Sequence, residues 1–182
     1  MTSLTLESIV DWLLHRGDGL YGGEAVTQLE HALQCAALAS ENKADNKLVI
    51  AALLHDIFHL APDTSDRHQP HEQLAALMLA DLFPAAVTEP VRMHVDAKRY
   101  LCAIDPLYWG SLSDMSKRSL EWQGGPFSTE QAANFISQPY AENAVRLRRW
   151  DDAAKVVGKV TPSLNQYIPL MQHLIREHAA IA

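Results

Sequence analysis

The sequence predicts an all-α protein, and three observations lead to that prediction. Apolar residues recur at helical spacing along most of the chain, glycine and proline separate these segments, and no stretch alternates apolar and polar residues as a half-buried strand would. At 182 residues, 48% of them hydrophobic, the chain can bury a substantial core. We therefore expect one helical bundle over residues 1–182, with about seven to nine helices.

Start and stop signals place the first helices. One is predicted over 4–15, ended by Gly17, and a second over about 24–40. Asp45 suits the N-cap of a third helix that continues through 47–60. Because the body of this third helix is apolar nearly all round, we expect it at the centre of the fold.

Prolines and capping residues place the later helices. Pro70 suits the first turn of a fourth helix, which Pro84 stops, and Thr88 is predicted to cap a fifth. A loop is expected over 62–70 and looser structure over 102–128. The remaining predicted elements are a short helix near 113–123, a helix capped by Ser128 and Gln131, one from Pro139 to Gly158, and a last helical region from Thr161.

Composition excludes several functions. The formal net charge of −7 argues against general binding to nucleic acid or to an anionic membrane, and no apolar run approaches transmembrane length. Cys35 and Cys102 lie far apart without CxxC spacing, which predicts neither a disulfide framework nor a thiolate zinc site. The first residues carry Glu7 and Asp11 and no basic leader, unlike a signal peptide. We expect a cytoplasmic protein; its oligomeric state is left open.

The stretch "AALLHDIFHL" (51–60) places ionisable residues in a very apolar run. On a helix, His55 and His59 would share a face, with Asp56 close by. Burying a carboxylate without a partner costs on the order of several kcal/mol, so Asp56 there needs a cation, a metal or strong donors. Neutral imidazoles offer lone pairs, and an aspartate can bridge two metal ions. The alternative is a solvated polar face, or a core histidine bonded to a backbone carbonyl.

Further histidines favour the metal. His31, His71 and His94 each lie on a different predicted helix, and a late carboxylate is available from Asp151 or Asp152. Such residues can converge in a bundle core as a two-metal site. Spacing alone does not choose between the two aspartates.

This order of residues resembles the HD-domain superfamily, all-helical proteins named for an adjacent metal-binding His-Asp pair. The resemblance spans residues of about 20–155, with a C-terminal helix near 162–180 expected to pack on that core. The segments "YGGEAVTQLEH", "HVDAKRYL" and "RLRRWDDAAKVV" are similar to the mixed-valent diiron oxygenases of the superfamily, in particular the 2-amino-1-hydroxyethylphosphonate dioxygenases.

The resemblance implies two iron ions, mixed-valent Fe(II)/Fe(III), with Asp56 bridging them. It further implies O₂-dependent cleavage of the C–P bond of a 1-hydroxy-2-aminoethylphosphonate, giving phosphate and glycine or a glycine derivative; the substituents on the amine are left open. The implied ligands are His31, His55, Asp56 and Asp151 for one iron and Asp56, His71 and His94 for the other.

The resemblance also implies roles in substrate binding. His59, Lys98 and Arg148 would bind the phosphonate, Tyr21 would occupy an iron position until substrate displaces it, and Glu24 would sense the amine. Weaker candidates for the phosphonate are Ser116, Ser119 and Gln123. Without the resemblance, Lys98 and Arg148 would be interpreted as surface cations, Tyr21 as an aromatic residue at the edge of the core, and Glu24 as an acid at a helix start. Phe58 departs from the family, which usually has a small residue before the second histidine.

Two other functions are alternatives, and the first of them uses nearly the same ligands. One is an HD-type phosphohydrolase, in which metal-activated water attacks a phosphate ester or nucleotide. The other is a non-catalytic helical module with a degenerate site. Tyr21, Glu24 and the His94/Lys98 pair favour the oxygenase, because simple hydrolysis does not require them.

Overall fold

A computed structural model describes residues 4–62 and 69–181 of the chain. In these two ranges the secondary structure is helical, with a single isolated β-bridge between Leu20 and Thr27 and no strand, so the predicted all-α class is confirmed. Most of the loop expected over 62–70 lies outside the described residues. None of the described helices combines the length and the hydropathy that a membrane span requires.

Ten α-helices and two 3₁₀-helices make up the described structure. In chain order they are α1 (Leu6–Arg16), α2 (Gln28–Glu41), α3 (Asn46–Leu54), η1 (Ile57–Leu60), α4 (His71–Leu79), α5 (Ala85–Ile104), α6 (Tyr108–Ser111), α7 (Asp114–Trp122), α8 (Thr129–Ile136), α9 (Ala141–Ala153), η2 (Leu164–Gln166) and α10 (Ile168–Ala179).

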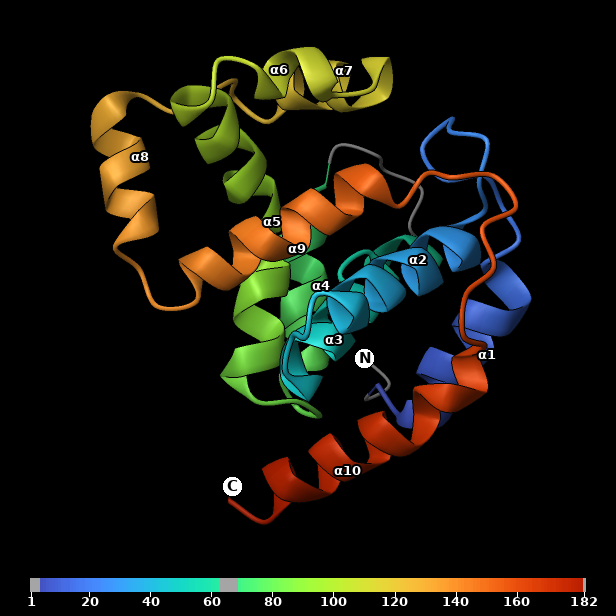
Figure 1. The fold of residues 1–182 in the computed structure, drawn as a ribbon. Coiled ribbons are helices and arrows are strands. Elements are labelled where there is room, and N and C mark those ends of the chain that lie inside the picture. The colour runs from blue at the N-terminus through green and yellow to red at the C-terminus, as the bar shows by residue number, and fades with distance from the viewer. Residues whose placement is uncertain (1–3, 63–68, 182) are drawn as a thin grey trace.

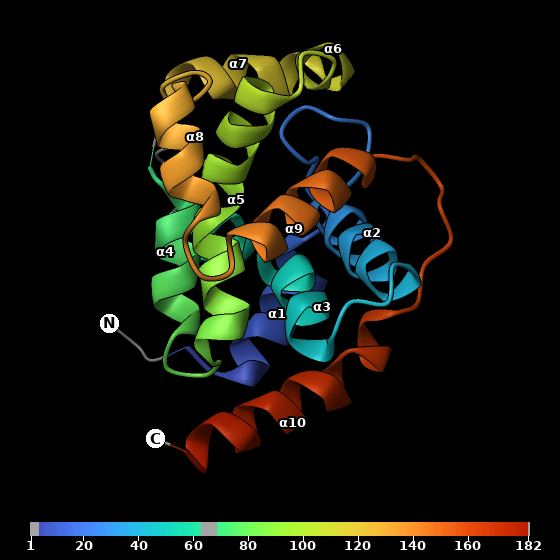
Figure 2. The same cartoon turned by 60° about the vertical axis from the view of Figure 1, so that its left-hand side comes forward.

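The centre of the fold is formed by α2, α3, α5 and α9, which pack on one another (Figure 1). Every residue from Leu48 to Leu54 of α3 is buried, as its apolar sequence predicts. Figures 1 and 2 show α10 along one end of the molecule, where it contacts α1 and α3, and α6 and α7 at the opposite end. The fold thus places the predicted metal ligands of the central helices beneath α7.

Capping residues explain several helix starts. The Asp45 side chain accepts a hydrogen bond from the Leu48 amide, and Ser128 forms a capping box with Gln131, as predicted. The second helix begins at Gln28 rather than near Glu24, because Thr27 caps it. The preceding residues turn instead: the φ angles of Gly22 and Gly23 are +51° and +87°, which glycine tolerates without strain.

Two later boundaries also differ from the prediction. The fifth helix begins at Ala85 after extended Pro84, so Thr88 is buried in its first turns instead of capping it. This helix also accommodates Pro90 in its interior. The helix expected to reach Gly158 ends at Ala153.

The third helix ends earlier than predicted, and this change matters for the site. It stops at Leu54; His55 is its C-cap, and Asp56 leaves helical geometry with φ −108° and ψ 15°. A 3₁₀ turn follows, in which the His59 amide donates to the Asp56 carbonyl at 3.0 Å. His55 and His59 therefore do not share one α-helical face, and Asp56 lies at a corner of the chain.

Candidate dinuclear metal centre

The side chain of Asp56 lies between two groups of imidazoles. Its Oδ2 is 3.4 Å from His55 Nε2, whereas its Oδ1 is 3.4 Å from His71 Nε2 and 3.7 Å from His94 Nε2. We name His31, His55 and Asp151 cluster A, and His71 and His94 cluster B. The two oxygens of one carboxylate thus face different clusters, which is the geometry that a bridging ligand requires.

The histidines present lone pairs to these clusters. Nδ1 of His31, His55 and His94 lies 2.9, 2.9 and 2.7 Å from a backbone carbonyl oxygen, which can only accept a hydrogen bond. Each Nδ1 therefore carries the proton, and Nε2 is left as an acceptor. Nε2 of His31 lies 3.4 Å from Nε2 of His55, and Nε2 of His71 lies 3.3 Å from that of His94. Imidazole lone pairs this close favour a cation between them.

The protonation states fit the same interpretation. Burial lowers the pKa of His71 to about 4 and that of His94 to about 3, so both are neutral near pH 7. Burial opposes ionisation of Asp56, but His55, His71 and the neighbouring imidazoles lower its pKa below the ordinary range. Its Oδ1 is buried without a hydrogen-bond partner. Neutral nitrogens around an ionised, unsatisfied carboxylate fit a transition-metal site with nitrogen and oxygen ligands.

Of the two candidate aspartates, Asp151 faces cluster A. Its Oδ1 lies 3.4 Å from His31 Nε2, and its Oδ2 lies 2.7 Å from Nη1 of Arg148. Asp152 turns away, toward Arg148 Nε at 3.2 Å and the Tyr108 hydroxyl. Arg148 is buried, not a surface cation, and its guanidinium is held between the two carboxylates. Burial would lower the pKa of Arg148, but Asp151 and Asp152 raise it well above its ordinary value.

A cysteine also borders cluster A. Cys35 Sγ lies 3.6 Å from His31 Nε2, and His31, Cys35 and His55 form one compact group of possible ligands. Cys35 was not predicted to belong to a site, although its position four residues after His31 on α2 places it on the same helix face. Burial raises the pKa of this thiol well above its ordinary value, which keeps it protonated and a weak ligand.

Tyr21 covers cluster A. Its ring stacks on that of His31 with centroids 3.6 Å apart, and its hydroxyl donates to Asp151 Oδ1 at 3.2 Å. On the side of cluster B, the ring of His59 lies 4.6 Å from that of His71. Phe58 packs against the main core, so its bulk is directed into the protein interior.

Lys98 is buried, with only 2% of its surface exposed. Its Nζ donates to Ser119 Oγ at 2.8 Å and to the Ser116 carbonyl at 3.5 Å, which joins α5 to α7. Burial, followed by the charge of Arg148, lowers the pKa of Lys98 to about 7. The side-chain oxygen of Gln123, at the end of α7, is buried without a hydrogen-bond partner.

Glu24 lies in the turn before α2, not at a helix start as expected. It forms an ion pair with Lys155, at 3.1 Å between Oε1 and Nζ. Burial opposes ionisation of Glu24, but Ser113 and Lys155 lower its pKa. Lys155 and Tyr108 were not predicted from the sequence, although Lys155 follows Asp151 by one helical turn in the sequence and this spacing could have pointed to it.

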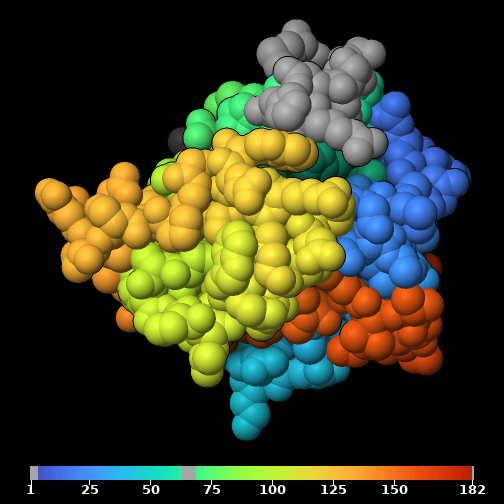
Figure 3. Space-filling view, turned by 90° about the horizontal axis from the view of Figure 1, so that it is seen from above, coloured from blue at the N-terminus to red at the C-terminus, as the bar shows by residue number. Residues whose placement is uncertain are grey.

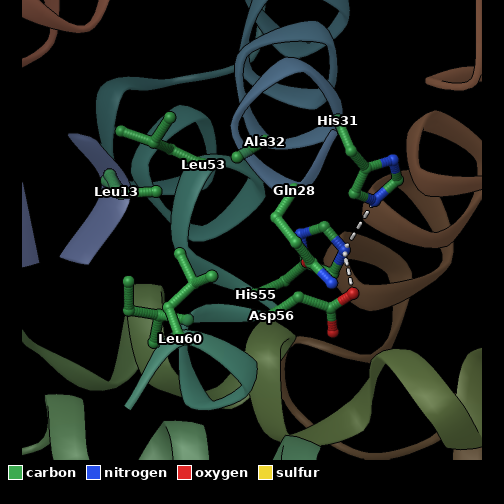
Figure 4. A pocket seen from close by; sticks show the side chains of 9 residues that line it. Leu13, Gln28, His31, Ala32, Leu53, His55, Asp56 and Leu60 are labelled. Atoms are coloured by element: carbon green, nitrogen blue, oxygen red, sulfur yellow. Dashed lines mark hydrogen bonds and ion pairs between the residues drawn. The ribbon is translucent and has the colours of Figure 1, made fainter. Parts of the chain in front are cut away.

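Apart from Gln28, the described residues that line the core side of the centre next to the ligands are apolar. On the core side, Figure 4 shows His31, His55 and Asp56 at one end of a small cavity and Leu13, Leu53 and Leu60 around the rest. Its volume of about 10 Å³ suits one water molecule at most. Tyr21, Glu24, Lys98 and Lys155 lie on the other side, beneath α7. Figure 3 shows that end of the molecule, where α6 and α7 (yellow) meet the loop before α2 (blue).

The helical fold and the His-Asp centre define an HD-domain protein. The HD domain family model matches residues 29–121, and the chain belongs to this family.

Known relatives cover most of the chain. It is 44% identical over 167 residues (88% of this chain, 83% of the relative) to the hydroxymethylphosphonate dioxygenase of Gimesia maris. It is 40% identical over 171 residues (90% and 86%) to the [1-hydroxy-2-(trimethylamino)ethyl]phosphonate dioxygenase (glycine-betaine-forming) of Leisingera caerulea. A third relative, 33% identical over 180 residues (94% and 82%), is an uncharacterized protein of Acanthamoeba polyphaga mimivirus. The resemblance to the oxygenase branch is confirmed.

Proposed function

We propose that this chain is a diiron oxygenase that uses O₂ to cleave the C–P bond of a 1-hydroxyphosphonate. The reaction consumes one O₂ per substrate; the C–H and C–P bonds at C1 break, and the products are phosphate and a carboxylate. The observation that carries the proposal is the placement of Asp56, whose two oxygens face two histidine clusters, in a chain 44% identical to a hydroxymethylphosphonate dioxygenase. The free cysteines, Cys35 and Cys102, fit a reducing cytoplasm.

The chain's own donors would hold two iron ions, mixed-valent Fe(II)/Fe(III). Those ions would activate O₂ and supply the Lewis acidity that orients the substrate oxygens, while the C–H and C–P bonds of the substrate provide the electrons that reduce O₂. The proposed ligands are His31, His55, Asp56 and Asp151 for one ion and Asp56, His71 and His94 for the other.

Hydrogen bonds and an ion pair with other residues orient these ligands. The backbone carbonyls that bind Nδ1 of His31, His55 and His94 set the tautomer and hold each ring in place. Arg148 binds one oxygen of Asp151 and leaves the other directed at His31. Arg148 therefore orients a ligand, and any contact that it makes with a phosphonate is additional to that task.

Lys98 is the best-placed cation for the phosphonate. An ammonium group that protein atoms have largely removed from water interacts strongly with a dianion, because little solvent screens the pair. Lys98 lies one helical turn after His94 on α5, so it lies beside cluster B. His59, whose ring lies against that of His71, is the second candidate on this side.

Tyr21 controls access to cluster A. Its ring covers His31 and its hydroxyl binds Asp151. A substrate that reaches this cluster must displace the hydroxyl, so Tyr21→Phe would remove a competing contact and lower KM. Ser119 contacts Lys98 and Ser116 contacts Lys155, while Gln123 at the end of α7 has a buried side-chain oxygen without a partner; these three complete the proposed substrate-binding set.

Activity with and without O₂ tests the proposal. Protein purified with its metals is analysed for iron and incubated with hydroxymethylphosphonate or 1-hydroxy-2-aminoethylphosphonate, in air and under argon, and phosphate is measured. Release that requires O₂ supports the oxygenase. Release at an undiminished rate under argon, or turnover of phosphate esters with manganese or magnesium, identifies a phosphohydrolase instead.

A further inference from the structure

The ammonium group of Lys155 occupies a complete cation-binding site. It lies 3.1 Å from Glu24 Oε1, 3.1 Å from Ser116 Oγ and 3.3 Å from Ser113 Oγ. It also lies 5.8 Å from the centre of the Tyr21 ring, within the range of a cation–π contact. The side chains of Lys155 and Glu24 are only 14% and 20% exposed, so this ion pair is largely shielded from water.

This site adjoins the metal centre through Tyr21. One face of the Tyr21 ring stacks on His31, and the hydroxyl binds Asp151, while the ring also lies near the Lys155 ammonium. A substrate whose hydroxyl and phosphonate reached cluster A would place the substituent on its second carbon close to this ring. The side chains around this position therefore decide which substituents fit.

A charged nitrogen on the substrate would need the contacts that Lys155 already makes. An ammonium or trimethylammonium group is recognised by a carboxylate and by an aromatic face. Among the described residues near Tyr21, the other carboxylates are unavailable: Asp151 and Asp152 both pair with Arg148, and Asp56 faces the histidines of the two clusters. Glu24 therefore remains, and Lys155 already neutralises it. A second cation would be repelled by Lys155 and would find no free anion.

We propose that Lys155 is a specificity-determining residue that fills the cation subsite from within the chain. The substrate is then a small 1-hydroxyphosphonate without a charged nitrogen, such as hydroxymethylphosphonate. This inference rests on the proposed function and narrows it, since the resemblance had implied an aminated substrate and a role for Glu24 in sensing the amine.

The ratio of two activities on one protein tests the inference. We expect kcat/KM for hydroxymethylphosphonate to exceed that for 1-hydroxy-2-aminoethylphosphonate by at least about tenfold, the equivalent of one moderately shielded charge contact. Lys155→Met should reduce this ratio by about tenfold, because Glu24 becomes free for the substrate ammonium. Lys155→Met/Glu24→Gln should restore the preference for hydroxymethylphosphonate. Lys159→Met, which removes one positive charge elsewhere on the same segment, is the matched control and should keep the wild-type ratio.

A ratio is insensitive to metal content and to the folded fraction, since both substrates meet the same protein. Anaerobic titration calorimetry of wild type and Lys155→Met with both phosphonates gives a second readout, in which the variant should gain affinity for the aminated compound only. A wild-type preference for the aminated substrate, or an unchanged ratio in Lys155→Met, would overturn the inference and leave Lys155 as a tie between α7 and the loop before α2. Absence of O₂-dependent phosphate release from either compound would instead overturn the proposed function.

Discussion

Replacing Asp56 by asparagine should remove both metal ions at once. The substitution keeps the size of the side chain but removes the negative charge, and it leaves an amide NH₂ facing lone pairs of imidazole. Because one oxygen of Asp56 faces His55 and the other faces His71 and His94, neither cluster keeps its shared ligand. A change confined to one oxygen's side would spare the other cluster.

The expected size of the effect follows from the position of Asp56 as a direct ligand. Changing a residue that merely supports a ligand typically weakens metal affinity about 10- to 100-fold, so losing a shared ligand should cost at least that much at each position. A metal present at a hundredfold excess over its Kd stabilises a folded protein by about 2.7 kcal/mol. For a chain of this size, that corresponds to a rise in Tm of about 5–10 °C, which Asp56→Asn should lose.

Metal content and melting temperature measure this prediction. Wild type and Asp56→Asn are purified identically, analysed for iron by mass spectrometry, and melted with and without added Fe(II) under argon. Asp96→Asn is the matched control. Asp96 lies on α5, the helix that carries His94, but its side chain pairs with Arg99, so this substitution should leave the metal content unchanged. If Asp56→Asn keeps the wild-type iron content and the same metal-dependent rise in Tm, the assignment of the bridging ligand is wrong.

Three further predictions concern pH and the aspartates of α9. Since burial lowers the pKa of Lys98 to about 7, kcat/KM for a phosphonate should fall as pH rises through about 7, and Lys98→Arg should extend activity to higher pH; an identical alkaline limb in both profiles would contradict this. Asp151→Asn should lower iron content, whereas Asp152→Asn should retain iron and lose about 1–3 kcal/mol of stability in urea unfolding, and equal iron contents would argue against Asp151 as the ligand. Burial lowers the pKa of His71 and His94 to about 4 and about 3 from 6.5, so the unfolded chain binds more protons below pH 6.5, and the Tm of the metal-free protein should fall as pH drops from about 6.5 toward 4; a flat Tm over that range would refute the burial of these rings.

Much of the fold was predictable because local signals and burial agreed. The apolar body of α3 predicted its central place, and the caps at Asp45 and Ser128 predicted helix starts that the structure confirms. Where a capping residue competed with a stronger local preference, prediction failed. Thr88 has the chemistry of an N-cap, but extended Pro84 ends the preceding turn and lets the helix begin at Ala85.

The break after Leu54 could not be predicted from helix propensity. The residues from His55 to Leu60 continue an apolar, helix-compatible pattern, and local preference alone extends the helix through them. In the structure, His55 and Asp56 turn toward imidazoles contributed by α2, α4 and α5. Those partners are distant in sequence, so the reason for the break is tertiary and no local pattern contains it.

Local sequence signals also predicted one part of the candidate site, whereas the rest depends on tertiary contacts. Histidines in apolar segments predicted most of the proposed ligands, because a buried imidazole requires a hydrogen-bond partner or a metal ion. The choice between Asp151 and Asp152 depended on which side of α9 faces the centre: Asp151 faces His31, whereas Asp152 faces the Tyr108 hydroxyl. The only sequence signal for Lys155 was its spacing of one helical turn after Asp151, which is weak because a lysine is ordinarily a solvated surface residue.

The donors of the two clusters come from segments that are far apart along the chain. His31 lies on α2, His55 and Asp56 at the end of α3, His71 and His94 on α4 and α5, and Asp151 on α9. Ions bound there would hold these segments together as covalent cross-links do. They would close long loops and so reduce the conformational entropy that the chain gains on unfolding. Iron starvation would then affect the protein's lifetime as well as its turnover, because removal of the ions would release the segments together and expose them to proteases.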